Sequence, residues 1–312
     1  MMFDLMVRRS EETVMADKNI LHMVTPLKHI SPFDVNMAVD AGYDVVFPYT
    51  DVTLEEISGL VQDAIFSRRP KVGARTAMFI GGRNAALALD MLSKARKALV
   101  PPFGISFFAD PSGSFTTAAA MVACVEKALK EKKQRDLKGL KVAVFGATGV
   151  VGFSAAVIAA LEGADVTLVG YDGIKRVSDA AQEIKTRFGA DVHAADGSDD
   201  AKKSGILKSA EAVFAAGRAG VQILSKAQIA QAKNLLIAAD VNAVPPSGIE
   251  GLEVNANGDE LSPGGALGIG ALAIGGIKYQ TEFGLFQKMT TAAKPVQYDF
   301  RDAFALAREL HG

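Results

Sequence analysis

The stretch 141–152, KVAVFGATGVVG, carries the strongest fold signal in this chain. Its apolar residues after Lys141 match the length of a buried strand. Three glycines at three-residue spacing follow, and the Ala-rich run after them predicts a helix to Leu161. A strand, a glycine turn and a helix place backbone N–H groups and the positive end of a helix dipole against a pyrophosphate. We therefore expect the dinucleotide-binding turn to consist of Gly146, Ala147, Thr148, Gly149, Val150, Val151 and Gly152.

The residues after this turn support the same interpretation, although the G-x-x-G-x-x-G spacing departs from the usual G-x-G-x-x-G and such turns also serve packing alone. A second strand is expected at 165–169. Asp172 lies about 20 residues past the last glycine, where a ribose-binding carboxylate is expected. Two further predicted strands end beside residues that we expect near the nicotinamide end of the cofactor. These are Ala215, Ala216 and Gly217 after one strand, and Asp240 and Asn242 after the next.

The chain before residue 132 alternates short apolar runs with helical segments. The predicted strands are 19–25, 43–47, 75–80 and 104–108. The predicted helices are 31–40, 53–66, 84–98 and 115–132. Ser31 and Pro32 suit the start of the first helix. Alternating strands and helices indicate a parallel sheet covered by helices on both faces.

The charged run 130–138, KEKKQRDLK, is expected to separate two domains. We predict an α/β protein of two doubly wound parallel-sheet domains, the second Rossmann-like, with a cleft between them. The predicted parts are a lead-in at 1–18, a substrate domain at 19–132, a dinucleotide-binding domain at 133–262 and C-terminal helices at 263–312 that return to the substrate domain.

Composition excludes several classes of protein. A formal net charge of -1 gives no electrostatic case for nucleic acid or an anionic membrane. The single cysteine, Cys124, forbids an intramolecular disulfide, and we expect a cytoplasmic protein. The N-terminal residues lack a signal-peptide core, and the glycine-interrupted run 264–277 is too short for a bilayer. The four scattered histidines predict no metal site.

The scarcity of candidate bases bears on the reaction. Oxidation of an alcohol generally needs a general base for the hydroxyl proton. A hydride lost from a carbon between two nitrogens leaves a resonance-stabilised cation, and no proton has to be removed. The protein then has to position two rings and tolerate positive charge. This second chemistry fits the sequence better.

Motifs over nearly the whole chain resemble the bacterial NAD(P)-dependent methylene-tetrahydromethanopterin dehydrogenases, a family that includes enzymes of methylene-tetrahydrofolate. The matching stretches are SPFD at 31–34, FIGG at 79–82, PFG at 102–104, GSFTTAAA at 113–120, GATGVVG at 146–152, ADVNAVPP at 239–246 and GALGIGALAIGGIK at 265–278. The resemblance implies an oxidoreductase of one-carbon (formaldehyde) metabolism, as in methylotrophy. It also implies tetrahydromethanopterin as the substrate carrier, NAD or NADP as the cofactor, and no metal.

The resemblance also suggests residues for the pterin side of the cleft. Phe33 would pack on the pterin, and Asp34 would bind it or balance the developing cation, although both also suit a helix start. Ser112, Thr116 and Thr117 would donate or accept hydrogen bonds, with helix capping as the alternative. Lys278 would anchor the pterin or orient Asp34. Because a cation beside a forming cation is unfavourable unless paired, we expect a carboxylate near Lys278.

The segment after the second strand of the nucleotide domain bears on cofactor choice. NADP-specific relatives carry a basic residue at this place, whereas this chain has Tyr171 and Asp172. We therefore expect NAD to bind well. Lys175 and Arg176 stand near enough in sequence to neutralise a 2′-phosphate, so we expect use of both nucleotides.

Three other functions remain open at this point. The first is a methylene-tetrahydrofolate dehydrogenase, with tetrahydrofolate instead of tetrahydromethanopterin as the carrier. A shikimate-dehydrogenase-like enzyme would use a Lys–Asp pair, for which Lys28 and Asp34 are the candidates. A non-catalytic module would bind NAD(P) without turnover. We also expect a homo-oligomer, in which the apolar helix around 283–289 packs against another subunit.

Overall fold

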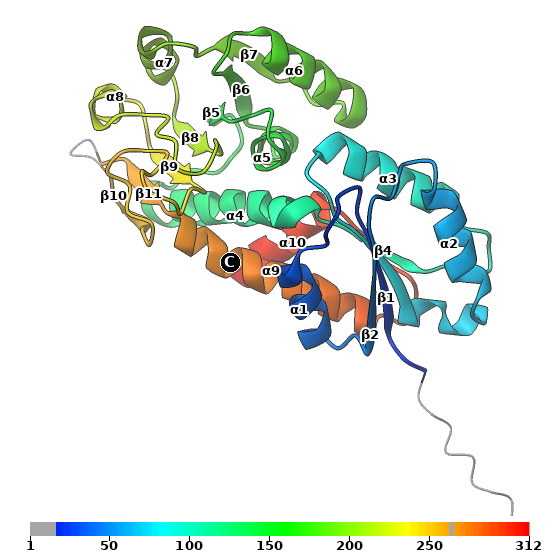
Figure 1. Cartoon of the computed structure of the whole chain (residues 1–312). Coiled ribbons are helices and arrows are strands. Elements are labelled where there is room, and N and C mark those ends of the chain that lie inside the picture. Colours follow the sequence, from blue (N-terminus) through cyan, green and yellow to red (C-terminus); the bar gives the residue numbers. More distant parts are fainter. Residues whose placement is uncertain (1–16, 262–264, 312) are drawn as a thin grey trace, which may run out of the picture.

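The computed structural model describes residues 17–261 and 265–311. Most of the predicted lead-in, and the first two residues of the predicted C-terminal segment, lie outside the described residues. The strands form two separate sheets, one in each half of the molecule, and long helices run between them (Figure 1). The α/β class and the two parallel-sheet units are thereby confirmed.

The first sheet has the strand order β12-β4-β3-β1-β2, and all its pairings are parallel. Its strands are β1 Ile20–Val24, β2 Val45–Tyr49, β3 Thr76–Ile80, β4 Ser106–Ala109 and β12 Gln297–Tyr298. The helices between them are α1 Pro32–Asp40, α2 Ile57–Phe66 and α3 Ala85–Lys97. Every residue of β3 and β4 is buried, as expected for central strands covered on both faces. The strand order reverses between β1 and β3, so the loops after these two strands border a crevice.

The second sheet has the order β10-β11-β9-β8-β5-β6-β7 and is parallel except for the β10–β11 pair. Its strands are β5 Lys141–Phe145, β6 Asp165–Gly170, β7 His193–Asp196, β8 Ala212–Ala215, β9 Ile237–Asp240, β10 Asn257–Glu260 and β11 Leu267–Ile269. Its helices are α5 Val150–Leu161, α6 Lys175–Phe188, α7 Asp200–Leu207 and α8 Lys226–Gln231. Here the order reverses between β5 and β8, so the glycine turn after β5 faces the loop after β8.

Three helices pack between the two sheets: α4 Ser114–Lys133, α9 Ala271–Thr291 and α10 Phe300–His311. Figure 1 shows α4 crossing the centre of the molecule, and it packs against α5, α9 and α10. The Ala-rich middle of α4 is fully buried, because small side chains let the neighbouring helices come close. The core is therefore continuous from one sheet to the other.

The charged run at 130–138 covers the end of a helix and the segment that follows it. Its first residues form the last turn of α4, which ends at Lys133. Lys132 and Lys133 donate hydrogen bonds to the backbone carbonyls of Gly258 and Gly265, at 2.7 and 2.5 Å. The two lysines thus attach α4 to the β10–β11 region. The chain therefore crosses from the first half to the second on a helix that packs against elements of both halves.

The C-terminal part of the chain adds to both sheets. Strand β11 pairs with β9 in the second sheet, and only after α9 does β12 pair with β4 in the first sheet. The helix expected to contact another subunit instead packs inside this one. Leu285, Phe286 and Met289 are buried, and the Phe286 ring lies 5.2 Å from that of Phe108. The apolar face of residues 283–289 is therefore used within this chain and gives no support of its own to an oligomer.

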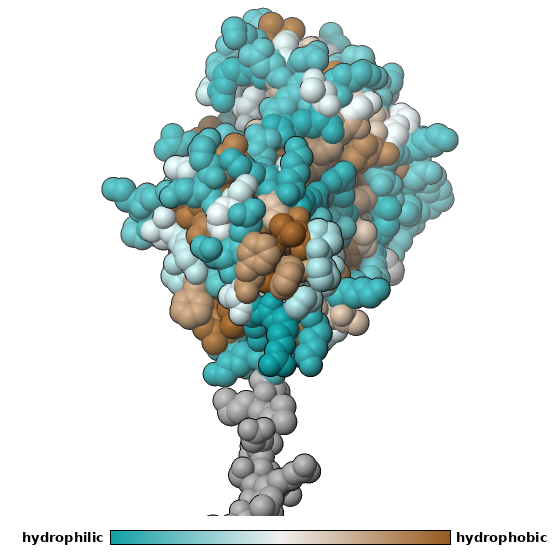
Figure 2. All heavy atoms as spheres, turned by 90° about the vertical axis from the view of Figure 1, so that its right-hand side faces the viewer, coloured by the Kyte–Doolittle hydropathy of each residue, from teal (hydrophilic) through white to brown (hydrophobic). Residues whose placement is uncertain are grey.

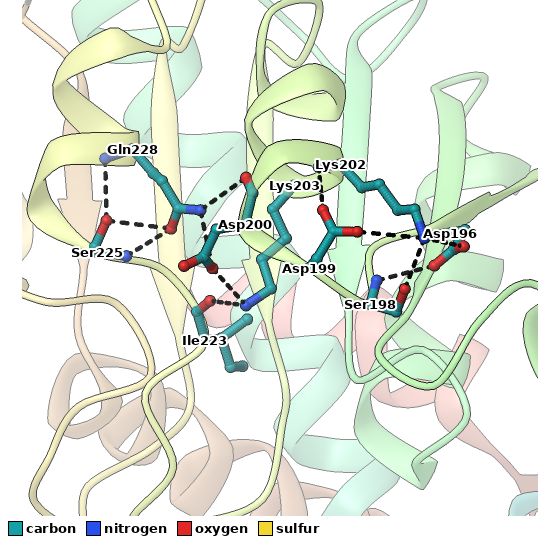
Figure 3. A network of polar contacts seen from close by, with 9 residues as sticks. All are labelled: Asp196, Ser198, Asp199, Asp200, Lys202, Lys203, Ile223, Ser225 and Gln228. Atoms are coloured by element: carbon teal, nitrogen blue, oxygen red, sulfur yellow. Dashed lines mark hydrogen bonds and ion pairs between the residues drawn. The ribbon is translucent and has the colours of Figure 1, made fainter.

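A polar network braces the loop after β8 (Figure 3). Lys203 of α7 donates to the carbonyl of Ile223 at 3.0 Å, and Ser225 and Gln228 form a capping box at the start of α8. Gln228 also reaches the backbone carbonyl of Asp200. Ile223 in turn fills the space beside Gly217, so the network holds the end of the predicted cofactor loop.

The outer face of the first half is largely hydrophilic, with a small apolar cluster near the middle of the view (Figure 2). Among the described residues, Phe66 is one of the more exposed large apolar side chains, and its ring packs edge-on against Phe103 at 5.3 Å. Within residues 17–261 and 265–311, no helix is both long and apolar enough to cross a membrane.

Candidate active site

The glycine turn after β5 packs directly on the loop after β8. Gly146 has φ +76°, and a Cβ there would lie 2.2 Å from the carbonyl oxygen of Ala216. A Cβ on Gly152 would lie 2.4 Å from the carbonyl oxygen of Gly146. Both positions therefore require glycine. Helix α5 begins at Val150, so its first N–H groups point into the crevice at the switch point of this sheet.

A cavity of about 360 Å³ lies beside this turn, between the two halves of the molecule. Thr148, Gly149 and Val150 form one wall, α6 forms another, and Arg83 and Asn84 at the start of α3 close it from the first half. A bidentate ion pair also joins the halves near this cavity, because Arg187 of α6 donates to Asp90 of α3 at 2.8 and 3.3 Å. A ligand in this cavity would therefore contact both halves.

The residues predicted to choose the cofactor form one exposed cluster. Arg176 donates to the Asp172 carboxylate and the Tyr171 hydroxyl, each at 3.1 Å, and to the Thr148 hydroxyl at 3.3 Å. Lys175 pairs with Asp179 at 3.3 Å. Asp172 is thus already engaged by a cation, and Arg176 connects the carboxylate with the glycine turn.

The residues predicted at the nicotinamide end differ in how close they lie to the glycine turn and in how far they are buried. Ala216 and Gly217 lie against the glycine turn, whereas Ala215 is fully buried in β8. Asp240 accepts hydrogen bonds from the N–H groups of Asn242 and Ile249. Asn242 accepts from the N–H groups of Gly220 and Val244 and donates to the carbonyl of Pro246. These bonds build the surrounding loops, and the contact of Asp240 and Asn242 with the nicotinamide carboxamide stays a prediction.

The pterin side of the predicted site lies at the switch point of the first sheet. Asp34, in the first turn of α1, and Ser112, after β4, line a cavity of about 220 Å³ with the loops after β1 and β3. Arg83 lines this cavity as well as the one beside the glycine turn. The two cavities are therefore neighbours, as hydride transfer between two bound molecules requires.

Lys278 reaches this place from α9. Its ammonium group lies 3.8 Å from the centre of the Phe33 ring and is paired with Glu282, one helical turn further on. Gly113 leaves the space, because a Cβ there would lie 2.9 Å from Lys278 Nζ. The carboxylate expected beside Lys278 is therefore confirmed, and Lys278, Phe33 and Asp34 come together.

The remaining predicted pterin contacts behave differently from one another. Thr116 is fully buried and donates to Asp110 at 2.6 Å, so the predicted substrate contact of Thr116 is corrected to support of Asp110. Thr117 is partly buried and donates to the Gly113 carbonyl at 2.6 Å. Ser112 has φ +55° and donates to the Gly82 carbonyl at 2.7 Å. Its left-handed backbone is strained for a non-glycine residue at the cavity wall.

Burial dominates the electrostatics of this cluster. Burial, aided by the Asp110 charge and opposed by Lys278, raises the pKa of Asp34 to about 7. Burial, again aided by Asp110, raises the pKa of Glu282 to about 8. Burial also raises the pKa of Asp110. The cluster thus combines three carboxyl groups with one ammonium group, and not all of the carboxyls are ionised at neutral pH.

Glu282, Asp110 and Arg83 were not predicted as site residues. Glu282 follows Lys278 at the spacing of a helical ion pair, which is the one sequence signal that pointed to it. Among the described residues, no group of three or more His, Cys, Asp or Glu side chains is arranged to hold a metal ion. The alternative Lys28–Asp34 pair is not formed: Lys28 is exposed, and Asp34 faces Lys278.

Comparison with solved structures shows what the fold is similar to. Shikimate 5-dehydrogenase from Listeria monocytogenes aligns with a TM-score of 0.52 and 14% identity, over 96% of this chain and 98% of that chain. An NAD-dependent malic enzyme from Thermotoga maritima aligns with a TM-score of 0.56 and 15% identity, over 93% and 84% of the two chains. At such identities the likeness concerns the two-domain dehydrogenase fold alone.

The sequence is similar to a family model and to two relatives. Residues 32–112 match the family model described as methylene-tetrahydromethanopterin dehydrogenase, N-terminal. The chain is 35% identical to the bifunctional protein MdtA of Methylorubrum extorquens, over 90% of this chain and 94% of the relative. It is 54% identical to the NAD(P)-dependent methylenetetrahydromethanopterin dehydrogenase of the same organism, over 95% of this chain and 99% of the relative. With this identity over nearly the full length of both proteins, the chain belongs to the NAD(P)-dependent methylenetetrahydromethanopterin dehydrogenase family.

Proposed function

We propose that this protein transfers a hydride reversibly from methylene-tetrahydromethanopterin to NAD(P)+, giving methenyl-tetrahydromethanopterin. The observation that carries the proposal is the pair of neighbouring cavities, one at the glycine turn and one beside Asp34, which share Arg83. Such an arrangement lets two large ligands meet face to face at the boundary between the halves. Family membership supplies the identity of the ligands.

The residues of the pterin side suit a reaction that creates positive charge. Hydride loss from the carbon between two nitrogens leaves a cation, and an ionised Asp34 beside it stabilises that cation. Phe33 offers an exposed ring face. The cluster around Lys278 holds three carboxyl groups, so the ammonium charge does not oppose the product. Ser112 and Thr117 are the remaining polar groups that we assign to pterin binding.

On the nucleotide side, the turn 146–152 binds the pyrophosphate through backbone N–H groups. Asp172 accepts a hydrogen bond from the adenosine ribose of NAD. When NADP is bound, Arg176 leaves Asp172 and binds the 2′-phosphate, helped by Lys175. Because Arg176 is 51% exposed, this rearrangement needs little desolvation. The protein therefore uses both nucleotides, with NAD at least competitive.

The proposal is tested by the rise in NAD(P)H absorbance with methylene-tetrahydromethanopterin, with NAD and NADP in parallel assays. Parallel assays contain methylene-tetrahydrofolate or shikimate instead. Turnover of the methanopterin with both nucleotides is expected. Turnover of the folate alone would change the carrier, and nucleotide binding without any turnover would indicate a sensor.

Two further expectations belong to the same proposal. The reaction takes place in the cytoplasm, where the buried Cys124 remains a free thiol. A homo-oligomer stays a prediction, although it no longer rests on residues 283–289. Light scattering of the purified protein measures the oligomeric state directly.

A further inference from the structure

Glu282 is a buried carboxyl group that the proposed hydride transfer does not yet use. It lies on α9, its side chain is 0% exposed, and its Oε2 atom accepts a hydrogen bond from Lys278 Nζ. Its other oxygen, Oε1, is shielded from water and has no donor among residues 17–261 and 265–311. An ionised carboxylate with an orphaned oxygen is unfavourable in such a place.

The charged groups that face Glu282 come from three parts of the fold. They are Lys278 on its own helix, Asp34 on α1, and Asp110 between β4 and α4. Asp110 accepts hydrogen bonds from two backbone N–H groups and from the Thr116 hydroxyl, so it is the carboxyl best equipped to be ionised. Ionised Asp110 and protonated Lys278 balance each other.

Asp34 and Glu282 then remain as a pair within hydrogen-bonding reach of each other. Two adjacent carboxylates in a buried site repel each other, so one of them holds a proton. Asp34 borders the cavity, whereas Glu282 is sealed from water. In a neutral Glu282, Oε2 still accepts from Lys278, and the carboxyl proton gives the group a donor for the neighbouring Asp34.

We propose that Glu282 is a positioning residue that works as a neutral acid: it receives Lys278 on one oxygen and donates a hydrogen bond to Asp34 from the other. This inference rests on the function proposed above. The arrangement keeps Asp34 ionised toward the pterin and gives the cluster one net negative charge. That charge is matched when hydride loss makes the pterin a cation, and no proton has to move during the reaction.

The test compares Glu282→Gln with Glu282→Leu. Glutamine keeps one acceptor and one donor in the same places, so kcat is expected to stay within about threefold of wild type. Leucine has a similar size but leaves Lys278 and Asp34 unpartnered, so kcat is expected to fall at least about thirtyfold. Equal losses in both variants would overturn the proposal, because they would mean that Glu282 acts as a carboxylate.

The pH profile separates this role from simple packing. Since the pKa of Glu282 is raised to about 8, the proton is present below that pH and lost above it. The kcat of wild type is therefore expected to fall as pH rises through about 8, and Glu282→Gln should remove this alkaline decline. An alkaline decline that persists unchanged in Glu282→Gln would overturn the proposal.

Infrared spectroscopy of the purified protein gives a result that does not depend on turnover. At neutral pH the wild type should show the carbonyl stretch of a protonated carboxyl group that is missing in Glu282→Gln. Identical carbonyl regions would overturn the proposal even if the wild type is active. If the wild type oxidises no pterin but the difference band is present, the proposed function fails while the protonation of Glu282 stands.

Discussion

Two pairs of a cationic side chain and a carboxyl group, with the same sequence spacing, lie on opposite sides of the proposed site. Lys278 and Glu282 stand four residues apart on α9, and Asp172 and Arg176 stand four residues apart at the start of α6. The side chains of the first pair are 13% and 0% exposed, whereas those of the second pair are 39% and 51% exposed. Identical spacing therefore produces a sealed pair in one place and a solvated pair in the other.

The difference in burial separates what each pair does. An exposed pair is screened by salt and contributes little to stability, so its members are free to change partners when a ligand arrives. A buried pair is fixed, and removing one partner leaves an uncompensated charge, at a cost of about 3–5 kcal/mol. The buried groups on the pterin side therefore keep their partners and their protonation states. The exposed groups on the nucleotide side can change partners when a nucleotide binds.

Lys278→Ala is expected to have the largest effect on activity, because it changes the buried pair. It leaves the three carboxyl groups of the cluster without their cation, so they take up protons and Asp34 loses its negative charge. We expect kcat/KM for the pterin to fall about a hundredfold, which corresponds to the lower end of that cost. Lys288→Ala is the matched control, because Lys288 lies on the same helix in an exposed pair with Glu309. Near-wild-type efficiency of Lys278→Ala would remove Lys278 from the site.

The same contrast explains how far the sequence alone leads. The sheet edges were predictable, because the glycine turn and the residues after β1 follow strong apolar runs. The carboxylate near Lys278 was predictable in kind, since an unpaired buried ammonium group is too costly. The sequence did not predict that Glu282 supplies this carboxylate, because the spacing is the same as in the exposed pair. The burial of Glu282 follows from the packing of α1, α4 and α9.

Other elements were missed for a related reason. Strand β11 spans only Leu267–Ile269, and β12 only Gln297–Tyr298, so neither has a local pattern of its own. Their partners β9 and β4 are distant in sequence, and the pairing alone makes them strands. Thr116 and Asn242 are engaged mainly by residues close to them in sequence, such as Asp110 and Pro246, but only the folded loops show that these bonds form. Polar side chains after a strand predict the edge of the sheet where a ligand binds. They do not predict which of these side chains remain free to contact the ligand.

Gly146→Ala tests whether the nucleotide side depends on backbone shape more than on charge. The added Cβ would lie 2.2 Å from the Ala216 carbonyl oxygen, so the turn must shift away from its present place. We expect unfolding free energy to fall by about 2 kcal/mol and NAD to bind about thirtyfold more weakly. Calorimetry measures both. Gly139→Ala is the control, because Gly139 has a similar φ of +70° and no heavy atom within 4 Å of the new Cβ. Equal effects would mean that backbone strain, and not the close approach, dominates.

Asp34→Asn tests whether the negative charge of Asp34 contributes to the reaction on the pterin side. It removes the negative charge and keeps the shape, so we expect kcat to fall about tenfold with little change in nucleotide affinity. Since the pKa of Asp34 is raised to about 7, its charge is absent below that pH and present above it. The kcat of wild type should therefore rise with pH through about 7, and Asp34→Asn should lose this rise. Asp40→Asn, at the exposed end of α1, should leave the profile as in wild type. A wild-type profile that is flat near this pH would contradict the assignment.

Asp172→Ala gives the smallest expected effect, because it alters only the exposed pair. The change removes the ribose acceptor and frees Arg176, so NADP should gain on NAD by about threefold in kcat/KM. Raising the salt concentration should reduce that gain, since salt screens an exposed arginine from a phosphate. Asp191→Ala removes the partner of Lys185 elsewhere on the surface and should leave the ratio unchanged. If Asp172→Ala does not move the ratio, cofactor choice lies outside this pair. The choice between NAD and NADP would then be fixed by the backbone of the glycine turn 146–152. The nucleotide side would in that case be as rigid as the pterin side, and the Asp172–Arg176 pair would not exchange partners.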